Sequence, residues 1–433
     1  MSKQKPSAMP WYETANPVPR TRKTVTIIGA GISGCTVAAA LQKRGFKVTV
    51  IDRHGHAGAE ASGNPEGIVY PKLSPRDDLL PQVNLAAIKF ASNYYRPFWD
   101  SGLGRQCGVL VVPENDKARS DFKLISQRYA DQTEMVETIA HEQLEELSGV
   151  PLQAESALYF PKLGWLPPQL ICKQLLELNN IPLVQADIKS LEYCEQQKRW
   201  QLYDKNQQLV SLEGDNHSES VIIASAFDCK AFSQTDYLPL RKIRGQITQL
   251  PCTEESRKMK MVICGECYIT PAENGLHGCG ATYNKDLFTT ELRDIDHQTN
   301  LAQITATDAG LAAVLGQPTS DSLSGRANFR CTTSDYLPIA GPVPNRSAML
   351  EDYAILRRDA KTALTTPGAY LPNLYVNCGM GSRGLSYAPL TAELLASEIA
   401  GEGVELDKEI NKELRHAMHP ARFLIRDLKR NRI

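Results

Sequence analysis

Three glycines and one aspartate near the start of the chain have the spacing of a nucleotide-phosphate site. Gly29, Gly31 and Gly34 form a G-x-G-x-x-G pattern, and Asp52 follows 18 residues after the last glycine. In this pattern the first glycine permits a tight turn, the second lets a pyrophosphate approach the backbone, and the third lets a helix pack closely on a strand. A carboxylate after the next strand can accept a hydrogen bond from a ribose hydroxyl. These residues could therefore bind a dinucleotide.

The sequence around these residues indicates the elements that position them. Residues 25–28 and 47–51 are apolar runs typical of buried parallel strands, and residues 33–44 have the composition of a helix that stops at Gly45. A strand, a helix and a second strand in this order form a βαβ unit, with the glycine turn at the helix N-terminus. Dinucleotide binding explains Asp52, whereas a glycine turn that serves only packing does not.

The stretch that follows Asp52 favours FAD over NAD. Residues 55–67 contain four glycines and are otherwise mostly polar or small. A simple NAD domain would continue promptly into its next helix and strand, whereas this long crossing fits a chain that wraps over a larger cofactor. We therefore expect FAD.

A second glycine turn lies near the end of the chain and points to the same cofactor. Three glycines at 379, 381 and 384 follow a strand expected at 374–377. A helix is expected from about Ala388 to Ala400, with Pro389 in its first turn, where the missing N–H costs little. The N-terminus of that helix can face the flavin end of FAD while the first helix faces the pyrophosphate. The alternative is an ordinary surface turn before a helix.

Overall charge argues against a protein whose whole surface binds nucleic acid. Lys and Arg number 48 and Asp and Glu number 49, which gives a formal net charge of −1. The segment 411–433 differs, because it carries seven Lys or Arg against Glu413 and Asp427. This local excess could follow phosphates, or it could be a solvated helix face.

The sequence favours a cytoplasmic chain. Residues 1–22 hold four prolines and no apolar run of the signal-peptide type, so we interpret them as a linker. No apolar run of 18 residues occurs, which argues against a membrane span. The 11 cysteines have irregular spacing, which is typical of reduced thiols.

One pair of cysteines, Cys264 and Cys267, forms a C-x-x-C motif. A structural metal site would need a second ligand pair at suitable spacing, and a redox site would place the motif at a helix start after a strand. Here the pair lies in a strand-like stretch followed by a turn. We expect no metal, and keep metal or redox chemistry as the less favoured alternative.

Further motifs carry a family resemblance. The first glycine unit is followed in order by residues 61–74 (ASGNPEGIVYPKLS), 164–176, 240–251, 267–283, 329–344 and 379–402. Together they resemble the D-amino-acid oxidase superfamily. Within it they are most similar to the FAD-dependent oxidoreductase half of the bifunctional tRNA 5-methylaminomethyl-2-thiouridine biosynthesis (MnmC) family, over about residues 10 to 430.

The resemblance implies an α/β fold, with a Rossmann-like FAD-binding domain and an antiparallel-sheet α+β substrate domain. It places the FAD-binding domain at residues 22–95, 155–235 and 325–405 and the substrate domain at 96–154 and 236–324. The linker-like segment 1–22 precedes them, and the basic tail 406–433 follows.

The implied reaction is oxidative removal of the carboxymethyl group from 5-carboxymethylaminomethyl-uridine, 2-thiolated or not, at the tRNA wobble position. The products are 5-aminomethyl-uridine and glyoxylate. The implied partners are the anticodon region of tRNA and a methyltransferase domain or protein, because such a domain precedes this one in the family. The chain is interpreted as either a stand-alone oxidoreductase or an excised domain. Two alternatives are an oxidase of free glycine, sarcosine or D-amino acids and an RNA-binding protein that FAD only stabilises.

The resemblance also assigns roles near the reacting carbon. Arg330 stands where the superfamily binds the substrate carboxylate, although an ion pair with Asp335 would be a structural alternative and Arg326 is a competitor. Tyr268 and Tyr283 either line the substrate pocket or pack on the sheet.

Two further residues near that centre have more than one interpretation. Arg383 could contact substrate or flavin, or could face solvent or a tRNA phosphate. Cys331 raises covalent flavin attachment as an option.

The residues expected to contact FAD come from both glycine turns and the segments between them. They are Gly29, Gly31, Ile32, Ser33, Gly34, Asp52, Arg53, Ser62, Gly63, Asn64, Gly67, Ile188, Ala224, Gly379, Gly381, Ser382, Gly384 and Leu385. Ala226 stands where the family usually has glycine, so we expect a weaker contact there.

Overall fold

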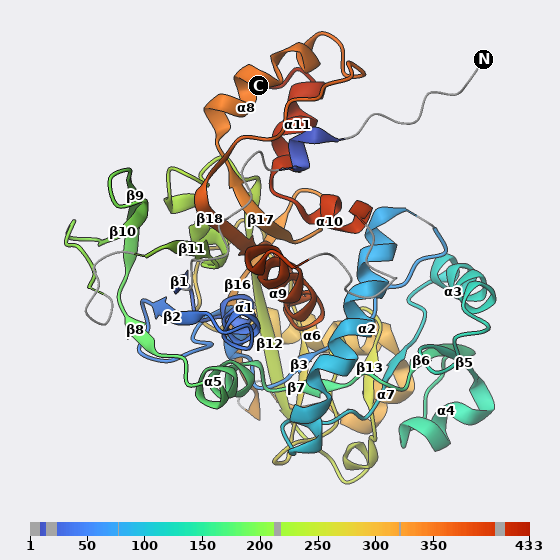
Figure 1. The fold of residues 1–433 in the computed structure, drawn as a ribbon. Helices are drawn as coiled ribbons and strands as arrows, with labels where there is room; N and C mark the ends of the chain where they lie inside the picture. The colour runs from blue at the N-terminus through green and yellow to red at the C-terminus, as the bar shows by residue number, and fades with distance from the viewer. Residues whose placement is uncertain (1–8, 14–23, 77, 212–217, 320–321, 403–411) are drawn as a thin grey trace, which may run out of the picture.

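The computed structural model describes residues 9–13, 24–76, 78–211, 218–319, 322–402 and 412–433. Two large β-sheets form its centre, and helices cover the first of them (Figure 1). Within the described residues, no helix is long and apolar enough to cross a membrane.

The first sheet has six strands and carries the glycine turns at its strand ends. Its order is β17-β18-β11-β1-β2-β8, and every neighbouring pair is parallel except β17 with β18. The strands are β1 (Thr24–Ile28), β2 (Lys47–Asp52), β8 (Leu183–Gln185), β11 (Ser220–Ile223), β17 (Ile339–Pro344) and β18 (Tyr370–Cys378). Its central strands β1, β2 and β11 are buried on both faces, as expected for a sheet covered by helices.

The second sheet has eight strands in the order β16-β12-β15-β14-β13-β4-β6-β5 and is antiparallel except for the β13 and β4 pair. Its strands are β4 (Val109–Val111), β5 (Glu137–Ala140), β6 (Ser156–Phe160), β12 (Leu240–Pro251), β13 (Val262–Cys264), β14 (Tyr268–Ile269), β15 (Leu276–Gly280) and β16 (Ser324–Thr333). Two ribbons complete the strands: β3 (Gly67–Ile68) with β7 (Trp165–Leu166), and β9 (Ile188–Cys194) with β10 (Arg199–Asp204).

The helices are named in chain order. They are η1 (Pro10–Tyr12), α1 (Ile32–Gln42), η2 (Ala61–Gly63), α2 (Leu79–Asp100), α3 (Asp116–Arg128), α4 (His141–Ser148), α5 (Pro168–Leu178), η3 (Ala226–Ala231), η4 (Ser256–Lys258), α6 (Asp294–Thr307), α7 (Ala309–Leu315), α8 (Arg346–Asp352), η6 (Ala354–Arg357), α9 (Gly384–Ala400), α10 (Lys412–Met418) and α11 (Ala421–Lys429).

Helix α1 is the buried centre of this arrangement. It packs between α9 and α5, and α2 packs on the other side of α9 (Figure 1). A close fit to β1 requires glycine at position 34, because a Cβ there would lie 1.9 Å from the carbonyl oxygen of Gly29. The βαβ unit predicted from the sequence is confirmed by β1, α1 and β2.

The C-terminal helices form a separate small layer with the N-terminal segment. η1 packs against α11 beside α8 and η6, and Trp11 is buried among them (Figure 1). Only residues 9–13 of the predicted linker 1–22 are described, and the rest lies outside the described residues.

Two expectations differ from the structure. Helix α9 begins at Gly384 rather than near Ala388, because the Tyr387 N–H already donates to the Arg383 carbonyl; Pro389 therefore lies inside the helix.

The predicted domain boundaries also assign β6 and β16 to the FAD-binding pieces. Both instead pair with strands of the eight-stranded sheet, β6 with β4 and β5, and β16 with β12. The remaining boundaries stay predictions.

Candidate active site

A cavity of about 470 Å³ lies where the two sheets meet. Ile28, Asp52 and Ala224, at the carboxyl ends of β1, β2 and β11, line one side, while Tyr268 and Arg330 of the eight-stranded sheet line the other. Ligands of open α/β sheets bind at this edge, where the strand order reverses. The cavity is therefore the candidate active site.

The first glycine turn opens toward this cavity. Gly29 has a φ of +114°, and a Cβ there would lie 2.6 Å from the Ala224 carbonyl oxygen, so only glycine fits. Asp52 accepts hydrogen bonds from the backbone N–H groups of Ala30 and His54, each at 2.8 Å. These bonds fix the carboxylate at the cavity wall and leave it further acceptor capacity.

The segment 55–67, which follows Asp52, contacts the N-terminus of helix α1. Ser62 Oγ accepts the Ile32 N–H at 2.9 Å, so this serine holds the helix N-terminus. Arg326 donates to the Ala59 carbonyl at 2.6 Å, and a Cβ at Gly63 would lie 2.6 Å from its guanidinium. Arg326 is not among the cavity-lining residues, so its position does not favour it as the competitor for the substrate carboxylate.

The second glycine turn is attached to β16. Gly379 and Gly381 have φ of +75° and +59°, the left-handed region that glycine adopts readily. The Gly381 N–H donates to the Cys331 carbonyl at 2.7 Å, which holds the turn beside the neighbouring Arg330. Helix α9 starts directly after the turn, so its N-terminus meets the cavity.

Most residues expected to contact FAD line the cavity. Those that do are Gly29, Gly31, Ile32, Ser33, Asp52, Arg53, Ser62, Asn64, Gly67, Ile188, Ala224, Gly379, Gly381, Ser382, Gly384 and Leu385. Gly34 and Gly63 do not; they let α1 and Arg326 pack closely. Ala226 has a φ of +52°, a conformation that glycine adopts without strain, which explains why glycine suits this position.

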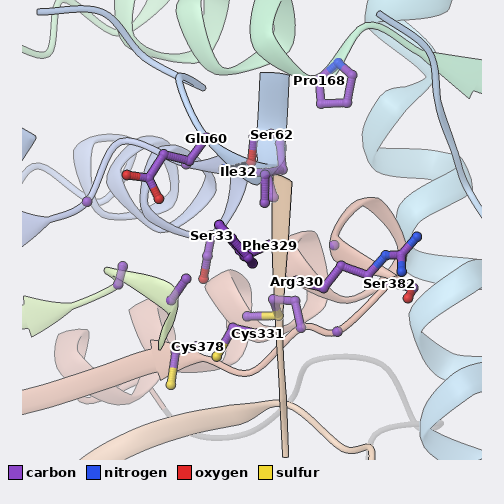
Figure 2. Close-up of a pocket in the computed structure, with 18 of the residues that line it drawn as sticks. Ile32, Ser33, Glu60, Ser62, Pro168, Phe329, Arg330, Cys331, Cys378 and Ser382 are labelled. Atoms are coloured by element: carbon purple, nitrogen blue, oxygen red, sulfur yellow. Dashed lines mark hydrogen bonds between the residues drawn. The ribbon is translucent and has the colours of Figure 1, made fainter. Parts of the chain in front are cut away.

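Arg330 projects from β16 in the cavity wall (Figure 2). Its guanidinium donates to the Thr282 carbonyl at 2.9 Å, and no described carboxylate forms an ion pair with it. Asp335, its suggested partner, instead pairs with Arg422 at 3.0 Å, so that structural alternative is wrong. Burial lowers the pKa of Arg330, since desolvation disfavours its charge.

Tyr268 and Tyr283 are the tyrosines whose electrostatic influence reaches Arg330. Tyr268 donates weakly to the Glu66 carbonyl at 3.4 Å, and burial raises the pKa of its phenol. Tyr283 is 48% exposed, with its ring 5.9 Å from the guanidinium carbon of Arg330. Both tyrosines line the cavity, Tyr268 inside and Tyr283 at its rim.

Arg383 lies in the second glycine turn and lines the cavity, and its guanidinium also contacts helix α2. It donates to the Tyr387 hydroxyl at 3.0 Å and, more weakly, to Asn84 at 3.5 Å. Lys72 also lines the cavity, and its pKa is lowered by burial and by the nearby Arg383 charge. Two cations therefore border the same part of the cavity.

The cysteines do not favour thiol chemistry. Cys331 lines the cavity (Figure 2), but burial raises the pKa of its thiol, which disfavours the thiolate needed for flavin attachment. Cys264 and Cys267 end β13 and precede β14, so they form a hairpin turn, and burial raises the pKa of Cys267 to about 12. Among the described residues, no group of three or more His, Cys, Asp or Glu could hold a metal.

Much of the basic tail is used in packing. Arg422 is buried in the ion pair with Asp335, Lys429 lies 4.5 Å from the Trp11 ring, and Lys412 pairs with Glu13 at 2.9 Å. Residues 406–411 of the predicted tail lie outside the described residues. The tail is therefore not a free phosphate-binding arm along most of its described length.

Three residues that shape the site were not singled out from the sequence. Gly245 of β12 makes room for Arg330, because a Cβ there would lie 2.6 Å from the guanidinium carbon. Phe329 lines the cavity next to Arg330 (Figure 2). Glu66 is buried behind Tyr268, and one of its carboxylate oxygens has no partner among the described atoms. Glu66 lies inside the motif 61–74, and this position in the motif was the one sequence feature that could have drawn attention to it.

The cavity suits a flavin dinucleotide. It is continuous from the first glycine turn to the second, so one elongated molecule can reach both helix N-termini. Asn377, fully buried in its wall, has a side-chain oxygen without a partner in the described structure, and a bound donor could satisfy it. The residues present therefore fit FAD.

Comparison with known proteins agrees with this site. Residues 24–398 match the DAO family, described as FAD dependent oxidoreductase. The chain is 35% identical over 98% of its length to the tRNA 5-methylaminomethyl-2-thiouridine biosynthesis bifunctional protein MnmC of Chromobacterium violaceum and covers 63% of that protein. It is 36% identical over 97% of its length to the MnmC of Pseudomonas aeruginosa, of which it covers 62%.

Solved structures share the fold. The glycine oxidase of Geobacillus kaustophilus superposes with a TM-score of 0.69 at 16% identity, covering 88% of this chain and 96% of the oxidase. The iminodiacetate oxidase of a Chelativorans species gives 0.65 at 22% identity, covering 88% and 97%. The resemblance and fold class predicted from the sequence are confirmed, as is FAD as the cofactor.

Proposed function

The chain belongs to the DAO family of FAD-dependent oxidoreductases, and from that premise we propose that it removes the carboxymethyl group from 5-carboxymethylaminomethyl-uridine, 2-thiolated or not, at the wobble position of tRNA. The products are 5-aminomethyl-uridine and glyoxylate. Similarity to the MnmC proteins over almost the whole chain supports this reaction. Because the chain spans less than two thirds of those relatives, their substrate and partners are part of the proposal.

One observation carries the proposal: a guanidinium without a carboxylate partner lies in the cavity wall. The modified side chain of the uridine is an N-substituted glycine, whose carboxylate needs a cation at a fixed distance from the reacting C–H bond. Arg330 has that charge, and no described carboxylate neutralises it. An arginine fork can hold a carboxylate through two parallel hydrogen bonds.

FAD, when bound, supplies the acceptor for the hydride lost from the carbon next to the amine. The residues of this chain position the substrate. Arg330 holds the carboxylate, Tyr268 and Tyr283 confine the glycyl group between them, and Arg383 adds a second positive charge at the cavity edge. Water then hydrolyses the oxidised C–N bond, which leaves the amine on the uridine and releases glyoxylate.

The product amine is the natural substrate for methylation. We therefore propose a methyltransferase domain or protein as the partner that takes the product, with the anticodon region of tRNA as the macromolecule bound and the cytoplasm as the place of action. The name of the MnmC relatives, which describes a bifunctional protein, supports the partner.

The test is reduction of the bound flavin without oxygen. The yellow protein is mixed with tRNA that carries 5-carboxymethylaminomethyl-uridine and, separately, with glycine, sarcosine and D-amino acids. Bleaching by the tRNA together with release of glyoxylate supports the proposal. Bleaching by a free amino acid alone would identify a small-amine oxidase instead, and no bleaching would leave an RNA-binding flavoprotein.

A further inference from the structure

The loop after β15, which we call the rim loop (residues 281–293), reaches the cavity at Tyr283 and carries two exposed aromatic rings. Tyr283 lines the cavity and is 48% exposed, and Phe288 is 69% exposed. Exposed aromatic side chains on a loop that reaches the mouth of a cavity mark a surface that a ligand or partner can cover. We therefore expect a ligand or partner to cover the rim loop.

A fully buried arginine holds this loop in place. Arg244 of β12 is 0% exposed and donates to the carbonyl oxygens of Thr289 at 2.8 Å and Glu291 at 2.7 Å. Its backbone N–H donates to the Asn284 carbonyl at 2.8 Å, and its charge pairs with Asp296 at 2.7 Å. Burying a cation is costly unless its donors are satisfied, and here they are.

The loop is also joined to the sheet at its far end. Gln246 accepts from the Arg293 N–H and donates to the Arg293 carbonyl, both at 3.0 Å. The backbone of the rim loop is thus held at 284, 289, 291 and 293, and Phe288, next to one of these points, stays exposed. A fixed backbone lowers the entropy lost when a ligand binds.

Charge indicates which part of an RNA the loop can contact. Tyr283 has two cations near its ring, Lys285 and Arg330, each at 5.9 Å from the ring centre. Along the loop itself, however, the charges of Lys285 and Arg293 are balanced by Asp286 and Glu291. A neutral surface with aromatic rings favours base faces over phosphates.

We propose that the rim loop is a stacking platform for an unpaired base beside the modified uridine. The inference rests on the proposed function, because the uridine side chain must enter the cavity and the nucleotides next to it must then lie on the rim. Single-stranded bases stack on exposed aromatic side chains without a sequence requirement. A free amino acid would need no such platform.

The test measures the affinity of the FAD-loaded 433-residue protein for an anticodon stem-loop carrying 5-carboxymethylaminomethyl-uridine, by fluorescence anisotropy. Phe288→Ala should weaken binding about tenfold. Because a base face and not a phosphate is lost, the slope of log affinity against log salt between about 50 and 200 mM should not change. Phe288→Trp should restore binding, whereas Phe288→Leu should not.

Leu178→Ala is the matched control, because Leu178 is 71% exposed on α5, outside the rim loop, and its loss should leave affinity unchanged. FAD content checks that each variant is folded. If Phe288→Ala binds as tightly as Leu178→Ala, or if Phe288→Leu restores binding as well as Phe288→Trp, the stacking platform is wrong. If the stem-loop does not bleach the flavin of the unaltered protein, the proposed function fails, and that result is separate.

Discussion

Arg330 is the residue on which the proposed substrate recognition depends most directly. Its charge is desolvated, and no described carboxylate forms an ion pair with it. A bound substrate carboxylate would therefore supply the partner that the folded chain lacks. Arg330→Ala should lower kcat/KM for the modified tRNA about 100-fold, equivalent to about 3 kcal/mol for a lost charge-assisted pair. Arg330→Lys should recover only part of this, because an ammonium lacks the planar fork.

Steady-state glyoxylate release measures the effect of both substitutions. Arg358→Ala, which removes an exposed arginine, serves as the control. FAD content should be the same in all of these variants. Normal turnover by Arg330→Ala would show that another cation binds the carboxylate.

Glu66 is a second residue with a measurable signature. Burial, with a smaller effect of Glu273, raises the pKa of Glu66 from 4.5 to about 7. Between these pH values the unfolded chain releases its proton while the folded chain keeps it, so the free energy of unfolding falls as pH rises through this range. Above about pH 7 both states are ionised and the loss is complete.

Glu66→Gln should remove that fall. The variant should match the unaltered protein near pH 4.5 and exceed its free energy of unfolding at pH 8 by on the order of 3 kcal/mol. Urea unfolding at both pH values measures the difference. The comparison between the two proteins matters because Glu398 also has its pKa raised to about 7 by desolvation and affects both curves equally. Parallel pH profiles would contradict the prediction.

At the scale of elements, strand β12 positions the arginine of β16. Gly245 leaves the space that the Arg330 guanidinium occupies, so a methyl group there must displace it. Gly245→Ala should keep FAD bound but lower kcat/KM for tRNA in the same way as Arg330→Ala. The double variant should be no worse than Arg330→Ala alone, because both changes remove one interaction. Additive losses would show that Gly245 acts elsewhere.

The elements that local pattern determines were predictable, and those that depend on distant partners were not. The glycine pattern at positions 29, 31 and 34 predicts a strand, a turn and a helix within one segment. The geometry of these three elements follows from residues that are neighbours in the sequence. Asp335 was a reasonable partner for Arg330 by proximity, yet it pairs with Arg422, 87 residues away.

The part that Gly245 plays could not be predicted for the same reason. Asn328 is directly opposite Gly245 on the neighbouring strand β16, and Arg330, two residues further along, reaches back over the glycine with its guanidinium. Only the register of the folded sheet brings the two together. The glycine itself carries no signal of the guanidinium that it accommodates.

At the scale of the molecule, residues 9–13 of the N-terminal segment pack against the C-terminal helix α11. The carbonyl groups of Pro10 and Glu13 accept from the Gly368 N–H at 3.1 and 2.8 Å. The Trp11 and Tyr353 rings pack edge to face, with their centroids 6.1 Å apart. The N-terminal segment is thus part of the C-terminal helical layer.

Whether the basic tail contacts tRNA should not be tested by removing α11, because its loss would expose the surface that it shares with Trp11. Replacing the exposed Arg430 and Arg432 is a cleaner test, since it changes charge without removing a buried helix.

The Trp11 contact should therefore contribute to stability and not to chemistry. Trp11 is 5% exposed, and its truncation to Ala leaves a cavity that costs about 3–5 kcal/mol in a rigid core. Trp11→Ala should lower the melting temperature and speed proteolysis within α10 and α11, while FAD absorbance and kcat stay unchanged below the transition. Met9→Ala, at a residue 48% exposed, should do neither. A Trp11→Ala protein that melts like the Met9 variant would mean that the C-terminal layer holds together without the N-terminal segment.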